Sequence, residues 1–199
     1  MHPNPLFRHE DTAALAAMVE RIGFAKIFLA TPDGPRVAHT PVLWAGNGRL
    51  RFHLARGNAL SRHLDGATAL ALADGAEGYV SPRWYANRAT VPTWDYVAVE
   101  MEGPVTHLAP EDTEILLYDL IEHHETRLGG EPWRAAETPR AVWDGLLRGI
   151  AGFELAVREW RPTVKLSQKR TPAERETIAD GQAAAGHPAL ATLMREFAA

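Results

Sequence analysis

The first quarter of the chain alternates apolar and polar positions in short runs separated by tight turns. Such alternation predicts half-buried strands over 24–31, 36–43 and 49–54, because successive strand side chains point to opposite faces. The intervening segments 32–35 (Pro-Asp-Gly-Pro) and 46–48 (Gly-Asn-Gly) carry the residues that close turns. The pattern therefore predicts three antiparallel strands in succession.

A helical period precedes these strands. Apolar residues recur every three or four positions from Leu15 to Ile22, which predicts a helix that covers one face of the sheet. Asp11 is placed to cap its first turn, and Gly23 is placed to end it.

The pattern continues with more strands. We expect a short helix over 58–66, a strand over 67–73, a brief strand into 79–80 and a long strand over 96–108. The long strand should bend near 103–104, where glycine precedes proline. Many short strands with tight turns indicate a barrel, so the fold class is mainly β with added helices.

The second half of the chain is mostly helical in pattern. Helices are predicted over 110–128 and from Thr138 onward, and residues 150–160 read as one returning strand. The capping-box sequence 171–174 (Thr-Pro-Ala-Glu) starts a helical C-terminal tail.

Length and composition bound the organisation. A chain of 199 residues, 46% of them hydrophobic, is long enough to bury a core. We expect a barrel domain with peripheral helices over 1–160. Residues 161–199 should form a basic connection and C-terminal helices that pack on the same domain.

Charge and residue types exclude several classes of protein. The net charge of −4 gives no global attraction to nucleic acid or to an anionic membrane. No apolar run approaches a membrane span, and the N-terminus lacks the apolar stretch of a signal peptide, so a cytoplasmic location is predicted. The absence of cysteine excludes disulfides, thiolate metal sites and cysteine nucleophiles.

Familiar catalytic and metal motifs are not found. The dinucleotide fingerprint, the phosphate loop and the esterase elbow are absent. The run 123–125 (His-His-Glu) does not indicate a metal site, because adjacent residues on a helix point about 100° apart. No metal site is predicted. For 165–167 (Lys-Leu-Ser), a ligand-binding or structural role is favoured over a lysine-activated serine.

One segment has the composition of a binding site. Five of the ten tryptophans and tyrosines lie between Tyr79 and Tyr96. Pro82 and Pro92 break both the strand and the helix period there, and the neighbouring residues supply hydrogen-bond donors and acceptors. A segment rich in aromatic and hydrogen-bonding residues suits a flat ligand that is anionic or heteroaromatic.

Residues 56–58 (Arg-Gly-Asn) follow a predicted strand and offer a guanidinium and free backbone N–H groups to a phosphate. The alternative is that Arg56 pairs with a surface carboxylate and Asn58 caps a helix. The position at a strand end slightly favours the phosphate.

A second basic stretch runs over 158–175, with six basic residues against two acidic ones. It is either a clamp for phosphate or DNA or a solvated connection, and the solvated connection is favoured over DNA. The residues that would contact DNA are Arg158, Arg161, Lys165, Lys169 and Arg170.

Several segments together resemble a known family. Six segments are similar to those of the PaiB-like family: 36–41 (Arg-Val-Ala-His-Thr-Pro), 53–58 (His-Leu-Ala-Arg-Gly-Asn), 79–85 (Tyr-Val-Ser-Pro-Arg-Trp-Tyr), 91–96 (Val-Pro-Thr-Trp-Asp-Tyr), 152–154 (Gly-Phe-Glu) and 165–168 (Lys-Leu-Ser-Gln). That resemblance implies an FMN-binding negative transcriptional regulator with the split-barrel fold of flavin reductases. It also implies a homodimer with flavin at the subunit interface.

Site residues follow from the resemblance position by position. It implies phosphate contacts from Arg56 and Asn58. The implied ring and ribityl contacts, with the last two as further contributors, are Ser81, Trp84, Tyr85, Thr93, Trp94, Lys165 and Ser167. The chain departs from the usual family residues at Ala59, Arg83, Asp95, Glu100 and Lys169. Asp95 and Glu100 add negative charge near a site for an anion.

The sequence thus predicts an FMN-binding split-barrel protein, acting as a flavin-dependent regulator or redox protein. If the protein is an enzyme, flavin carries the chemistry and the protein binds and orients it. The alternatives are a DNA-binding repressor that works without flavin chemistry and a haem-binding split barrel.

Overall fold

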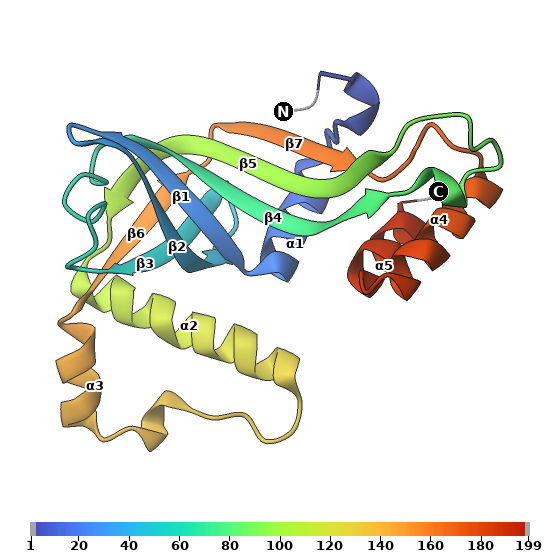
Figure 1. Cartoon of the computed structure of the whole chain (residues 1–199). Coiled ribbons are helices and arrows are strands. Elements are labelled where there is room, and N and C mark those ends of the chain that lie inside the picture. The colour runs from blue at the N-terminus through green and yellow to red at the C-terminus, as the bar shows by residue number, and fades with distance from the viewer. Residues whose placement is uncertain (1–2, 198–199) are drawn as a thin grey trace. The chain divides into compact units, whose positions relative to one another are not determined.

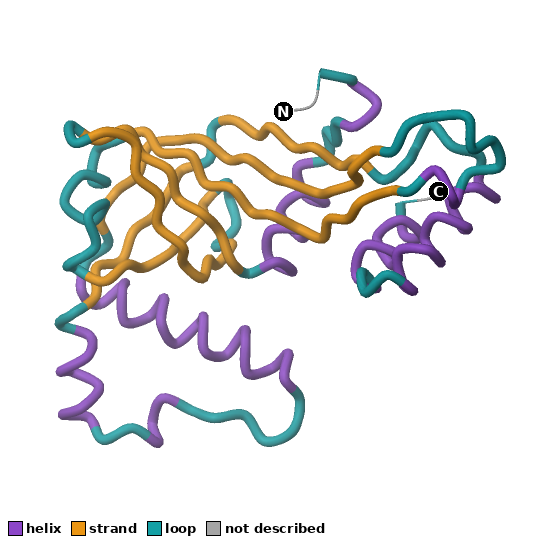
Figure 2. Tube along the Cα trace, viewed as in Figure 1, coloured by secondary structure: helices purple, strands orange, loops and turns teal. Residues whose placement is uncertain are grey.

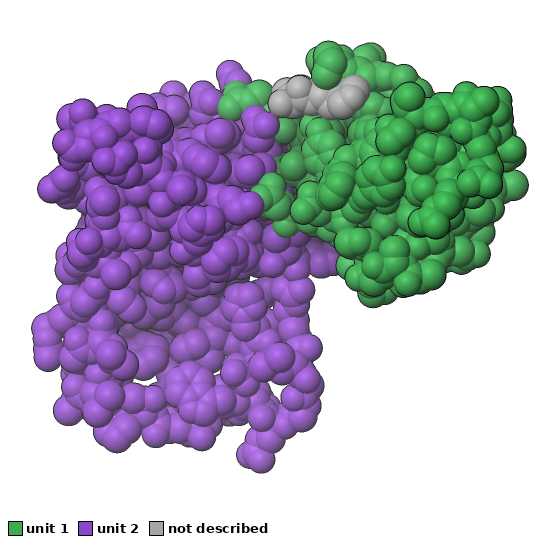
Figure 3. Space-filling view, viewed as in Figure 1, with its two compact units in different colours: residues 1–15, 74–99, 161–199 green, residues 16–73, 100–160 purple. Residues whose placement is uncertain are grey.

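The computed structural model describes residues 3–197, and its contacts divide the chain into two compact units. Unit 1 comprises residues 1–15, 74–99 and 161–199, and unit 2 comprises residues 16–73 and 100–160 (Figure 3). One boundary falls between Trp160 and Arg161, where the sequence analysis divides the chain. That residues 161–199 belong to the same domain as the barrel stays a prediction.

Seven strands form the sheet, in the spatial order β4-β1-β2-β3-β6-β5-β7 (Figures 1 and 2). They are β1 (Phe24–Thr31), β2 (Gly34–Trp44), β3 (Arg49–Ala55), β4 (Thr68–Val80), β5 (Thr93–His107), β6 (Ile150–Ala156) and β7 (Glu159–Lys165). An additional pairing of β4 with β5 closes six of them into a barrel. Closure removes the open sheet edges that would otherwise invite further strands, and β7 adds to the outside of β5.

The barrel core comes from strict alternation. In β3, Leu50, Phe52 and Leu54 are buried while their neighbours are not. Phe52 lies directly opposite Phe153 of β6, and their rings stack with centroids 5.6 Å apart. Burying such a side chain contributes about 1.5–3 kcal/mol.

β6 is buried along almost its whole length, including one carboxylate. Glu154 accepts hydrogen bonds from Arg49 at 2.5 Å and from Arg51 at 2.8 Å, so each of its oxygens has a guanidinium partner. This arrangement satisfies the buried charge within unit 2.

Helix α2 (Pro110–Leu128) packs on the barrel through Leu116 and Leu120, which cluster with Leu108 and Leu43. The short helices η3 (Ala135–Glu137) and α3 (Arg140–Leu147) follow. Helices α2 and α3 confirm the helices predicted over 110–128 and from Thr138 onward, whereas η3 was not predicted.

Helix α1 (Thr12–Ile22) confirms the first predicted helix. Asp11 Oδ1 accepts from the backbone N–H groups of Ala13 and Ala14, which satisfies two donors of the first turn. Gly23 ends the helix with φ of +64°, a conformation that glycine adopts at little cost.

Unit 1 contains α4 (Pro172–Ala184) and α5 (Pro188–Glu196), with the short helices η1 (Pro5–Phe7) and η2 (Pro82–Trp84). Thr171 and Glu174 form the predicted capping box of α4. Ile178 of α4 and Leu190 of α5 are fully buried. Within residues 3–197, no helix has both the length and the apolar character to cross a membrane.

The predicted helix over 58–66 is wrong. This segment forms consecutive turns, with backbone hydrogen bonds from Ser61 to Asn58 and from His63 to Leu60. The Asn58 side chain accepts from the Leu60 N–H and closes a turn. The asparagine side chain stabilises a turn at this point instead of capping a helix.

Two strand predictions also need correction. The strands predicted over 67–73 and 79–80 are one continuous strand, β4. Gly75 does not break it, because a Cβ there would lie 3.0 Å from Val97 Cβ, so glycine permits close approach of the strands.

The single strand predicted over 150–160 is instead β6 and β7, which lie on opposite sides of β5. The chain turns between them at 157–158 in order to reach the other edge of β5.

Candidate functional site

Unit 1 contains a cleft of about 470 Å³. It is lined by η1, the loop after η2, the start of β5 and the segment between β7 and α4. The lining residues are Phe7, Tyr85, Thr90, Val91, Pro92, Thr93, Asp95, Lys165, Ser167, Gln168, Lys169 and Arg170. Aromatic, hydroxyl and charged groups from distant parts of the sequence thus share one surface.

The strand period brings the polar groups together. Thr93 and Asp95 are two residues apart on β5 and face the same side, while Trp94 faces the other. β7 is the neighbour of β5 and ends at Lys165. Lys165 therefore reaches Thr93 and Asp95 from the adjacent strand.

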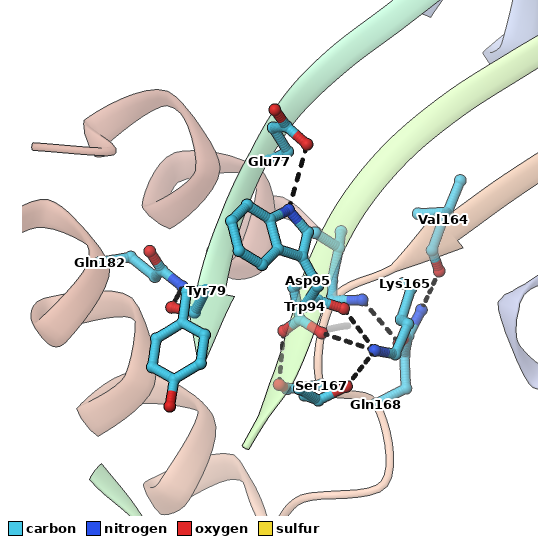
Figure 4. A network of polar contacts seen from close by, with 11 residues as sticks. Glu77, Tyr79, Trp94, Asp95, Val164, Lys165, Ser167, Gln168 and Gln182 are labelled. Carbon is cyan, nitrogen blue, oxygen red and sulfur yellow. Dashed lines mark hydrogen bonds and ion pairs between the residues drawn. The ribbon is translucent and has the colours of Figure 1, made fainter. Parts of the chain in front are cut away.

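A buried carboxylate lies at the centre of this network (Figure 4). Asp95 is fully buried, and its Oδ2 accepts a hydrogen bond from the Ser167 hydroxyl. Lys165 Nζ donates to Thr93 Oγ1 and to the backbone oxygen of Trp94, and lies 3.9 Å from Asp95 Oδ1. Among residues 3–197, Oδ1 has no hydrogen-bond partner.

The two charged groups are perturbed in opposite directions. Burial raises the pKa of Asp95, although the Ser167 hydrogen bond and the Lys165 charge oppose the rise. Burial lowers the pKa of Lys165, and the nearby Asp95 charge opposes that fall. Desolvation therefore exceeds mutual attraction for both groups.

The segment after β7 is held in an unusual conformation. Ser167 has φ of +58°, a conformation that is uncommon for residues other than glycine and is concentrated at functional sites. Gln168 supports the turn by accepting from Leu166 N at 2.8 Å and donating to the Val164 backbone oxygen. The conformation directs the Ser167 hydroxyl to Asp95.

Aromatic rings and cations form another part of the cleft. The Arg170 guanidinium lies 3.6 Å from the centre of the Tyr85 ring, and Lys169 Nζ lies 5.9 Å from the centre of the Phe7 ring. Arg170 also forms an ion pair with Glu174 at 3.9 Å. These contacts are cation–π pairs that hold positive charge beside aromatic surface.

Four of the nine predicted site residues line the cleft, namely Tyr85, Thr93, Lys165 and Ser167. Trp94 contributes its backbone oxygen to Lys165, whereas its indole donates to Glu77 and lies edge-on to Tyr79.

Two other predicted residues of unit 1 have structural contacts. Ser81 is buried and its hydroxyl accepts from the Arg83 N–H at the start of η2. Trp84 packs closely on α4, because a Cβ on Gly181 would lie 2.3 Å from the indole. Their contacts with a ligand stay predictions.

Arg56 and Asn58 belong to unit 2. Arg56 Nε donates to the backbone oxygen of Arg148, and both arginines line a cavity of about 520 Å³ beside the start of α2. Asn58 closes the turn described above. Sequence reasoning missed Arg148, whose position beside Arg56 depends on the return of β6 to β3.

Unit 2 also has an apolar cavity of about 380 Å³ between α2, α3 and the barrel. It is lined mainly by aliphatic side chains with Trp133 and Trp143, and by His53 and His124. Burial lowers the pKa of both histidines. Glu125 also lines this cavity, but no lysine or arginine does, and such cations distinguish the cleft of unit 1.

Sequence reasoning treated Asp95 as a departure from the family and not as a site residue. A signal for its burial was present, since Asp95 is in phase with the buried Val97, Val99 and Met101. Gln168 and Phe7 were also missed, and no local pattern distinguishes them. Lys169 and Arg170, considered for DNA, line the cleft together with Lys165.

Comparisons with known proteins agree with this fold. A family model described as "Putative FMN-binding domain" matches residues 1–159. The chain is 31% identical over 119 residues to the protease synthase and sporulation protein PAI 2 of Bacillus subtilis, covering 59% of this chain and 56% of that protein. An uncharacterized protein of Aspergillus fumigatus is 29% identical over 171 residues, covering 67% and 66%. The chain thus spans less than two thirds of these relatives' lengths.

Solved structures share the architecture at low identity. The FAD and haem binding protein from Mycobacterium smegmatis is 16% identical with a TM-score of 0.61, covering 89% of this chain and 79% of that one. The flavocytochrome Anf3 from Azotobacter vinelandii is 15% identical with a TM-score of 0.54, covering 82% and 75%. The predicted split-barrel fold and the PaiB-like resemblance are confirmed.

Proposed function

Because the chain belongs to the family of FMN-binding domains whose model matches residues 1–159, we propose that it binds FMN and that the cleft of unit 1 receives the isoalloxazine ring. The observation that carries the proposal is the convergence of Tyr85, Thr93, Lys165 and Ser167 on that cleft. These residues come from three separate sequence segments, and each was predicted as a ring or ribityl contact.

The residues present fit such a group. Tyr85 with Arg170 offers a flat, cationic surface to a planar ring, and Lys165 and Lys169 add positive charge for an anionic ligand. The buried Asp95 Oδ1 lacks a hydrogen bond among the described residues, and a ring N–H would supply one.

The cofactor and the protein have separate roles in this proposal. FMN, when bound, supplies electron transfer that no side chain of this protein offers. The protein binds and orients the ring and excludes water from the polar floor of the cleft. Flavin-based redox activity and flavin-dependent regulation are both consistent with this role, and their distinction requires an electron donor or a DNA target.

A direct test is retention of flavin by the purified protein. We expect the visible flavin absorption to co-elute with the protein after incubation with FMN and gel filtration. A protein that elutes colourless after that treatment contradicts the proposal. A Soret band in the protein as purified would instead favour the haem-binding alternative.

We propose, as the resemblance implies, that Arg56 and Asn58 are phosphate contacts within unit 2, where Arg148 lies beside Arg56. An Arg56→Ala variant should bind FMN about 10-fold more weakly and riboflavin with unchanged affinity, because a charge-assisted hydrogen bond to phosphate is lost. The matched control is Arg62→Ala, which removes an exposed arginine that pairs with Asp33 and donates to His63. Equal FMN affinity of the Arg56→Ala and wild-type proteins would remove Arg56 from the phosphate site.

We also propose a homodimer in the cytoplasm. Support comes from unit 2, where Leu128 and Leu146 are 78% and 63% exposed on α2 and α3. Such exposed apolar side chains are available for burial against a second copy of the chain. Light scattering of the eluted protein tests this, and a monomer at all concentrations contradicts it.

The repressor alternative remains a second hypothesis for the chain. Lys165, Lys169 and Arg170 all line the cleft, so three of the five basic residues considered for DNA face it. Salt-dependent retention on DNA, with and without FMN, distinguishes a regulator from a redox protein.

A further inference from the structure

The floor of the unit 1 cleft carries two neighbouring groups with unused hydrogen-bonding capacity. Asp95 is completely buried, yet only one of its two carboxylate oxygens has a hydrogen bond from the described residues. A carboxylate accepts several hydrogen bonds, and a buried acceptor without one is costly. Oδ1 is therefore an acceptor that a ligand can satisfy.

Lys165 is the second group. An ammonium has three hydrogens to donate, and Lys165 directs two of them to Thr93 Oγ1 and the Trp94 backbone oxygen. Its distance of 3.9 Å to Asp95 Oδ1 is an ion pair but too long for a hydrogen bond. One ammonium hydrogen therefore remains for a ligand oxygen.

The surrounding contacts fix which oxygen of Asp95 is left free. Ser167 donates to Oδ2 from a backbone with φ of +58°, and Gln168 holds this turn from both sides. The carboxylate is thereby oriented with Oδ1 on the side of Lys165. An uncommon backbone conformation that orients a buried acceptor is typical of a binding site.

An acceptor beside a donor matches one kind of ligand edge. An imide edge, C(=O)–N(H)–C(=O), presents a donor N–H flanked by acceptor oxygens, and the pyrimidine end of the isoalloxazine ring has this edge. We propose that Asp95 Oδ1 accepts from the flavin N3–H while Lys165 Nζ donates to an adjacent ring carbonyl. This inference rests on the proposed function and deepens it, since it assigns Asp95 as the residue that selects the imide edge.

Asp95 combines complete burial with a place in the lining of the cleft. The carboxylate is 0% exposed, although the residue lines the cleft. A ligand edge therefore contacts Oδ1 only after a small shift of the side chains that cover it, and Tyr85 with its stacked Arg170 provides a flat surface in the same cleft. A ligand that carries a methyl group in place of the N3 hydrogen offers no donor.

The test compares FMN with N3-methyl FMN on the full chain. We expect the wild-type protein to bind FMN at least about 10-fold more tightly, since a hydrogen bond to a charged acceptor is lost with the methyl compound. The Asp95→Ala variant should bind the two flavins equally. As a matched control, Glu77→Ala removes a carboxylate of unit 1 that bonds the Trp94 indole and does not line the cleft, so it should keep the preference.

A spectroscopic measurement separates hydrogen bonding from steric bulk. With FMN labelled by ¹⁵N at N3, the bound N3–H proton should shift downfield in the wild-type protein and lose that shift in Asp95→Ala.

Equal binding of both flavins by the wild type overturns the inference while the proposed function stands. A preference that persists in Asp95→Ala assigns the effect to methyl bulk and also overturns it. If the wild type binds neither flavin, both the inference and the proposed function fall.

Discussion

Two buried carboxylates, one in each unit, are treated differently by their surroundings. Glu154 in the barrel of unit 2 has a guanidinium on each oxygen, from Arg49 and Arg51. Asp95 in unit 1 has a hydroxyl on one oxygen and no hydrogen bond on the other from the described residues. A fully satisfied buried charge holds structure together, whereas a partly satisfied one is available to a ligand.

The two units also differ in what surrounds a tightly packed glycine. In unit 2, a Cβ on Gly103 would lie 1.8 Å from the backbone oxygen of Ala156. In unit 1, a Cβ on Gly78 would meet side chains, with Gln182 Oε1 at 2.5 Å and Leu190 Cδ2 at 2.9 Å. A methyl group at Gly103 would meet backbone atoms, which move less easily than the side chains that a methyl group at Gly78 would meet.

The largest expected effect tests this difference in tolerance. Gly103→Ala should lower the free energy of unfolding by about 4 kcal/mol or more, because strands β5 and β6 must separate to admit the methyl group. Gly78→Ala should cost about 1–3 kcal/mol, since side chains can shift. Urea unfolding measures both, and Gly57→Ala, with nothing within 4 Å of its Cβ, is the control. A smaller loss at Gly103 than at Gly78 contradicts the comparison.

The next effect separates a structural carboxylate from a binding one. Glu154→Ala should cost about 2–3 kcal/mol of stability, because two arginines lose their partner and Glu154 is only 7% exposed. The folded variant should keep the FMN affinity of the wild type. Titration with FMN under conditions where the variant is folded checks this, and a large loss of affinity would place Glu154 in the site.

The smallest of these effects is a pH dependence. Because burial raises the pKa of Asp95, the folded protein holds this proton more tightly than the unfolded chain does. The free energy of unfolding should therefore fall as pH rises from the ordinary carboxyl pKa, about 4, through the raised value. In Asp95→Asn this fall should be absent.

Urea unfolding at several pH values from 4 upward makes this measurement, and the slopes of the two proteins are compared. Identical slopes in the wild type and in Asp95→Asn would mean that the carboxyl is not perturbed by burial.

Local signals predicted much of the fold. The Asp11 cap, the strands β1 to β3 and the capping box of α4 were predicted, since each depends on residues within one turn or one strand. The helix expected over 58–66 was wrong because asparagine stabilised a turn instead. The split of 150–160 into β6 and β7 depends on both strands flanking β5, which no local pattern encodes.

The candidate site shows the same limit. Tyr85, Thr93, Lys165 and Ser167 were proposed from sequence and they line one cleft. Asp95 was taken for a departure from the family, although its phase with Val97 on β5 indicated burial. Sequence alone does not show which oxygen of a buried carboxylate is paired, because that depends on the Ser167 turn.

The sequence by itself determined the first helix, the strands β1 to β3, the start of α4 and the family motifs that the chain carries, since these depend on side-chain period and on capping over a few residues. Only the tertiary structure decided that β7 delivers Lys165 and Ser167 to the start of β5, and that Asp95 lies buried between them with one free oxygen. The physical reason is that burial and hydrogen-bond satisfaction are properties of groups brought together across 72 residues of chain, and are fixed only when the strands pair.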